Sequence, residues 1–137
     1  MSVLLIVTIA AYALTGQAVA EGGFKLTARV ESACHASILS DTVSRDRAGE
    51  AVYRASVSER CNQAGGYKLV LRHPAGLRGA YVQTDDGRID ISSSATDTVI
   101  AQSDLAGIRE RDISVIYQPT SGEIAFAVEL RPKNAVR

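Results

Sequence analysis

The chain has 137 residues, with fifteen basic and fifteen acidic side chains and a formal charge of zero. Charges of both signs are interspersed from Lys25 to Arg137 without a run of five like charges, which argues against nucleic acid and anionic membranes as partners. Tryptophan is absent, aromatic residues make up only 5%, and most large apolar residues are Val, Ile and Leu, so a β-rich core is expected.

The N-terminal segment predicts export. Residues Val3 to Gly16 carry no charge, and Ala18-Val19-Ala20 follows as a small-x-small cleavage motif. A membrane anchor is the alternative, but the run is at the lower limit of the ~20 residues that span a bilayer and has no basic flank. We expect residues 1–20 to be a secretory signal peptide and residues 21–137 to form one domain, located in the periplasm, at the cell surface or outside the cell.

An alternating segment comes next. Phe24, Leu26, Ala28 and Val30 alternate with charged or polar residues, which is typical of a strand with one buried face. A strand of this kind exposes too much apolar surface to stay free in water, because each large side chain gains about 1.5–3 kcal/mol on burial. These four residues are therefore candidates for a strand-exchange interface.

Two cysteines, Cys34 and Cys61, are 27 positions apart. In an exported protein such a pair predicts a disulfide. A zinc site with His35 and His73 is the rival interpretation, but the close ligand spacings that pre-position a zinc site do not occur. We expect a disulfide, and neither a metal nor another cofactor.

Further strands follow with the same two-residue period. Residues 40–50 interrupt this alternation with a polar stretch, which predicts a loop or an edge strand. No window of the sequence has sustained helical spacing. The positions expected to face inward are Tyr53, Ala55 and Val57 in one strand, Tyr67, Leu69 and Leu71 in the next, and Ile124, Phe126, Val128 and Leu130 in the last, with "AYVQT", "RIDIS" and "DISVIYQP" between them.

Turn residues separate these strands. Asp86-Gly87 predicts a tight hairpin between "AYVQT" and "RIDIS", and Ser121-Gly122 predicts a turn before the last strand. About seven or eight short strands at this spacing favour an all-β fold, a two-sheet antiparallel sandwich, over a parallel α/β sheet.

Catalytic motifs are missing from the sequence. None of G-x-S-x-G, H-E-x-x-H or G-x-x-x-x-G-K occurs, so no enzymatic activity is expected. His73 is interpreted as a strand-end residue beside the turn at Pro74. Asp85, Asp86 and Asp90 are explained by turn preference rather than by calcium, and residues 109–112, Arg-Glu-Arg-Asp, predict a solvated turn.

The segments "FKLTARVESAC" and "CNQAGGYKLVL" together resemble the secreted pilin and spore-coat-protein-U-like domains of bacteria over Phe24 to Leu71. The chain departs from that group at "SILSDTV", where a Phe-Gly pair is usual. The resemblance implies an immunoglobulin-like sandwich with a disulfide near its start, assembled through a chaperone–usher system, with a periplasmic chaperone among its partners.

Two classes of function remain. The first is a structural or assembly subunit that joins a protein partner or further copies of itself by β-strand addition. The second is a self-contained sandwich that binds a ligand or protein through its loops, for which "RHPAGLRGA" and "SSSATDT" are the natural surfaces. Both leave one question open, because the strand from Phe24 to Val30 either completes its own domain or is donated to another.

Overall fold

Eight β-strands form the part of the chain that the computed structural model describes, which is residues 30–120 and 122–134. No helix occurs within those residues. The strands are β1 (Cys34–Arg45), β2 (Ala51–Cys61), β3 (Tyr67–Arg72), β4 (Tyr81–Thr84), β5 (Gly87–Asp90), β6 (Asp97–Ser103), β7 (Gly107–Tyr117) and β8 (Ala127–Pro132).

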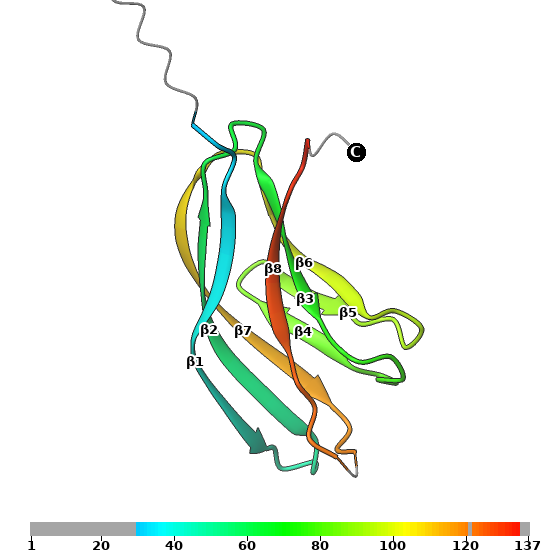
Figure 1. Cartoon of the computed structure of the whole chain (residues 1–137). Helices are drawn as coiled ribbons and strands as arrows, with labels where there is room; N and C mark the ends of the chain where they lie inside the picture. Colours follow the sequence, from blue (N-terminus) through cyan, green and yellow to red (C-terminus); the bar gives the residue numbers. More distant parts are fainter. Residues whose placement is uncertain (1–29, 121, 135–137) are drawn as a thin grey trace, which may run out of the picture.

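The strands make two antiparallel sheets. One has five strands in the order β1-β2-β7-β4-β5, and the other has three in the order β6-β3-β8. Figure 1 shows the small sheet lying across the large one, with β1 and β8 side by side, and these two edge strands are in contact. The predicted all-β, two-sheet antiparallel sandwich is confirmed.

The core lies between the two sheets and follows the predicted alternation. Tyr53, Ala55 and Val57 are buried on β2 while Arg54 on the same strand is exposed. The inward residues of β3, Tyr67, Leu69 and Leu71, are buried as expected. Branched side chains from both sheets meet there, and the fully enclosed ones are Val57, Leu69, Leu71, Val82 and Val115.

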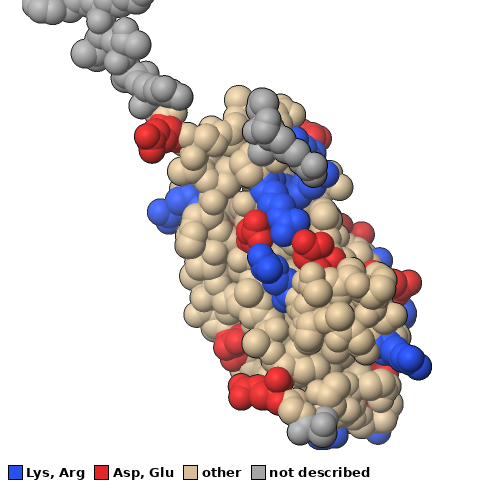
Figure 2. All heavy atoms as spheres, turned by 45° about the vertical axis from the view of Figure 1, so that its right-hand side comes forward, with Lys and Arg blue, Asp and Glu red and all other residues tan. Residues whose placement is uncertain are grey.

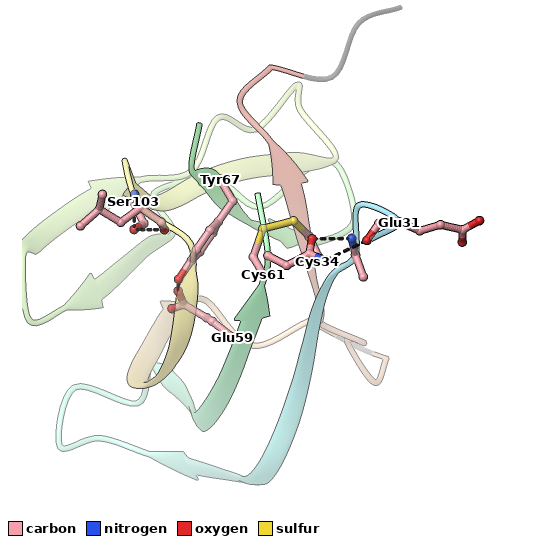
Figure 3. Close-up of a disulfide and its surroundings, with 9 residues drawn as sticks. Glu31, Cys34, Glu59, Cys61, Tyr67 and Ser103 are labelled. Carbon is pink, nitrogen blue, oxygen red and sulfur yellow. Dashed lines mark hydrogen bonds between the residues drawn. A yellow bond between two sulfur atoms is a disulfide. The ribbon is translucent and has the colours of Figure 1, made fainter. Parts of the chain in front are cut away.

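The predicted disulfide between Cys34 and Cys61 is confirmed. The two residues face each other across the first rung of the β1–β2 ladder, so the bond joins adjacent antiparallel strands at one end of the sandwich. Figure 3 shows it beside Glu59 and Tyr67.

The hairpin between β4 and β5 differs from the prediction by one residue. Thr84 pairs with Gly87, so Asp85 and Asp86 form the turn rather than Asp86 and Gly87. Both aspartates keep negative φ, and only Gly87 has the positive φ of 126° that the hairpin requires. The Thr84 hydroxyl accepts a hydrogen bond from the backbone N–H of Asp86 and closes the turn at 3.2 Å.

The connection before the last strand is not a simple turn. β7 belongs to the five-stranded sheet and β8 to the three-stranded sheet, so residues 118–126 cross from one sheet to the other. β8 begins at Ala127, and the predicted strand residues Ile124 and Phe126 precede it, partly buried against the core. Ser121, which was expected in the turn, lies outside the described residues.

The beginning of the chain is described from Val30 onward. Phe24, Leu26 and Ala28 lie outside the described residues, as does the expected signal peptide. Val30 is 79% exposed, and residues 30–33 precede the first strand. The polar stretch from residue 40 continues β1 as an edge strand up to Arg45, one of its two predicted forms, whereas β6 was not predicted.

Within residues 30–120 and 122–134, no helix is long and apolar enough to cross a membrane.

Candidate functional site

A groove opens beside the second half of β1. It has a volume of about 730 Å³, and its walls come from β1, from the start of β2, from the end of β7 and from the crossing segment before β8. The residues that matter most for its chemistry are Asp41, Val43 and Arg45 on β1, Tyr53 on β2, Tyr117 on β7, and Glu123, Ile124 and Phe126 on the crossing segment.

The groove arises because the core covers only the first half of β1. Ala36 and Ile38 pack against the core from that half. A register irregularity between Ile38 and Ser40 then inserts Leu39 as an extra residue, and such a bulge bends a strand. Beyond it the side chain of Val43 is 64% exposed, so the edge strand presents an apolar residue to solvent where the sandwich is open.

Aromatic rings form the floor of the groove. The ring of Phe126 lies 4.9 Å from that of Tyr53 and 5.5 Å from that of Tyr117, measured between centroids. These separations are in the range of favourable tilted and edge-to-face pairs. The floor is therefore aromatic, while Asp41, Arg45 and Glu123 supply charges among the lining residues.

Tyr53 also makes the main polar contact of the groove. Its hydroxyl donates a hydrogen bond to Oδ2 of Asp41 at 3.0 Å. Burial of the ring, and then this hydrogen bond and the negative charge of Asp41, raise the pKa of Tyr53 from 10.0 to about 12.

Stability should therefore depend on Tyr53 at high pH. Because the folded-state pKa lies above the unfolded one, the phenol stabilises the fold below pH 10.0, and this stabilisation is lost as the pH rises toward about 12. In urea unfolding between pH 9 and about 11.5, the wild type should lose more stability than Tyr53→Phe. Parallel losses in the two proteins would contradict this assignment.

On both sides of the groove the described residues include edge-strand backbone that pairs with no further strand among them. β1 is the edge of the described five-stranded sheet, and β8 is an edge of the three-stranded sheet. Residues 123–126 lead into β8 and lie outside its ladder with β3. Edge backbone of this kind is a template on which another strand can pair.

A buried ionic cluster spans the two sheets at the other end of the sandwich. Arg111 on β7 donates to Glu59 on β2 at 2.8 Å, and the hydroxyl of Tyr67 on β3 donates to the second oxygen of Glu59 at 2.7 Å. Arg111 also reaches Asp86 at 3.0 Å. Glu59 is 0% exposed and Arg111 only 7%, so the expectation that residues 109–112 form a solvated turn is wrong.

The cluster is electrostatically satisfied. Burial opposes the charge of Arg111, but the hydrogen bonds and attraction of Glu59 and Asp86 outweigh it and raise the pKa of Arg111. Burial, and then the hydrogen bond to Glu59, raise the pKa of Tyr67. No buried side-chain nitrogen or oxygen lacks a partner in the described part of the chain. Ion pairs and hydrogen bonds therefore hold the cluster together across the two sheets.

The remaining candidate residues have structural partners as well. His73 is buried beyond the end of β3, with Nδ1 donating to the carbonyl of Pro74 at 3.0 Å and Nε2 hydrogen-bonded to the hydroxyl of Thr98 at 2.9 Å. Asp86 contacts Arg111, and Asp90 contacts Arg88 at 2.9 Å. His35 is exposed on β1.

The outer face of the three-stranded sheet carries paired charges. Arg131 on β8 contacts Asp97 on β6 and Glu129 on its own strand, each at 3.0 Å, and Arg72 on β3 lies 3.5 Å from Glu129. The hydrogen bond from Arg131, together with its positive charge, lowers the pKa of Glu129. Figure 2 turns this side of the molecule forward and shows basic and acidic side chains intermixed on it, so no extended field of one sign develops there.

Val30, the one predicted interface residue that the structure describes, and the groove lie at opposite ends of β1. Val30 precedes the first residue of that strand, whereas the groove begins at Asp41. Sequence reasoning did not find the groove. The available signal was the spacing of Asp41, Val43 and Arg45, which places a valine between charges on one face of a polar strand. Comparisons of the chain with protein-family models, curated proteins and solved structures found no match.

Proposed function

We propose that this protein is an exported, non-enzymatic assembly subunit with an immunoglobulin-like sandwich, and that its copies associate by β-strand addition. The donated strand is the segment from Phe24 to Val30, and the acceptor is the groove beside β1 of a second copy. The observation that carries the proposal is a groove of about 730 Å³ with aromatic side chains in its lining, beside strand edges that pair with no further strand among the described residues, in a chain that also has an alternating segment before its first described strand.

The chemistry of the two parts is complementary. Phe24, Leu26, Ala28 and Val30 would face the aromatic floor of the groove, while their backbone extends the exposed edge of a sheet. The donated segment also carries Lys25 and Arg29. The groove presents two carboxylates, on Asp41 and Glu123, against the single cation of Arg45.

Length favours a second copy over the segment's own domain. The residues from Phe24 to Val30 extend over about 23 Å as a strand. If the chain turned back at residues 31–33 and paired along its own β1, Phe24 would lie opposite Ser40, before the groove begins at Asp41. The same segment of another copy can reach the groove, because no short connection ties it to this β1.

The mature chain should self-associate at micromolar concentration, and a labelled peptide "FKLTARVES" should bind it saturably. The substitution Val43→Glu should weaken both processes by about tenfold or more, because it places a charge against the apolar floor. Analytical ultracentrifugation and fluorescence anisotropy measure the two effects.

Ile108→Glu is the matched control, since Ile108 is 72% exposed on β7 and does not line the groove. It should change association and peptide affinity by less than twofold. A mature chain that stays monomeric and binds no peptide, or equal effects of the two substitutions, would refute the proposal.

The second candidate is a binding domain that uses its loops. One observation favours it: the loops within "RHPAGLRGA" and "SSSATDT" lie together, because the N–H groups of His73 and Gly76 donate to the carbonyls of Thr96 and Ser93 at 3.0 and 2.7 Å. The two loops form one continuous surface, with exposed serines at Ser92, Ser93 and Ser94. A monomer that bound a ligand at this surface would establish this second function.

A further inference from the structure

Asn62 holds the chain that precedes β1. Its side-chain oxygen accepts from the N–H of Ala33 at 2.7 Å, and its side-chain nitrogen donates to the carbonyl of Glu31 at 2.7 Å. The backbone N–H of Asn62 also donates to the carbonyl of Ala33 at 3.0 Å. Figure 3 shows Glu31 near the disulfide between Cys34 and Cys61.

The amide of Asn62 acts here as an additional peptide group. A primary amide has a donor and an acceptor in one plane, as a backbone amide does. Asn62 directly follows Cys61, the last residue of β2, and its contacts continue the β1–β2 ladder past the disulfide. The chain from Glu31 to Ala33 is therefore held in line with β1 and cannot turn back without breaking all three hydrogen bonds.

A turn at these residues would open a competing state. Among the described residues no strand pairs with β1 on the side away from β2, although β8 lies against β1, and the segment from Phe24 to Val30 has the length to pair with Cys34–Ser40 as a hairpin. In that state the segment from Phe24 to Val30 would pair with β1 of its own domain and could not be donated, and the groove would stay empty. A contact that keeps residues 31–33 extended excludes this hairpin.

We propose that Asn62 is a positioning residue for assembly, which directs the N-terminal strand away from its own β1 and presents it to a second copy. This role rests on the proposed function, since it requires that the strand is donated.

The test uses the mature chain with Asn62→Ala. Self-association should weaken by about tenfold, because the strand then divides its time between donation and the hairpin, whereas the groove's affinity for the free peptide "FKLTARVES" should rise or stay within twofold. Asn62→Asp, which keeps the acceptor for Ala33 and loses the donor to Glu31, should give an intermediate loss. Gln63→Ala in the same loop is the control and should leave both values unchanged.

Unchanged association of Asn62→Ala, with peptide binding intact, would overturn the positioning role and leave the groove in place. Equal loss of association and peptide binding would also overturn it, because Asn62 would then support the fold in general. A wild-type chain that neither associates nor binds the peptide would refute the proposed function, and with it this role.

Discussion

Replacing Arg111 with methionine should lower the free energy of unfolding by about 3–5 kcal/mol, because it leaves the carboxylate of Glu59 buried without its cation. Glu59 is 0% exposed and has two partners, Arg111 and Tyr67. Tyr67 cannot balance a full charge on its own. Urea unfolding followed by circular dichroism measures the difference, and the loss should appear as a lower midpoint with an unchanged slope.

Two further variants identify the cause of that loss. Arg54→Met changes an exposed arginine on the outer face of β2 and should alter stability by no more than about 0.5 kcal/mol. The double variant Glu59→Leu/Arg111→Met removes both charges and should be more stable than Arg111→Met alone. If the double variant is no more stable than Arg111→Met alone, the uncompensated charge is not the reason.

Replacing Cys34 and Cys61 with alanine should destabilise the fold by about 3–4 kcal/mol, from the entropy that the unfolded chain regains when a 27-residue loop is released. For a domain of this size the melting temperature should fall by about 10–20 °C, which scanning calorimetry measures. The disulfide also joins β1 to β2 beside Asn62, so its loss should loosen the same end of the sandwich.

The redox state gives an independent check. Mass spectrometry of the unreduced mature protein should find it two hydrogens lighter than the reduced form. Two free thiols in protein purified without reductant would contradict the bond, as would a melting temperature that does not change on reduction.

The sequence by itself determined the strands that have one apolar, buried face and one polar, exposed face. Tyr53, Ala55 and Val57 on β2 and the inward residues of β3 were predictable because a strand with one buried face alternates locally, whatever it pairs with. The disulfide was predictable because the sequence predicts export and contains a single pair of cysteines, which leaves few alternatives.

Only the tertiary structure decided the features that depend on distant contacts. Arg111 was expected in solvent because its neighbours are charged, and its burial depends on Glu59, which lies 52 positions away on another strand. The groove exists because the core covers the first half of β1 and leaves Val43 exposed. A local sequence pattern does not show how far one sheet extends over the other, because that depends on how the strands pair and pack across the sandwich.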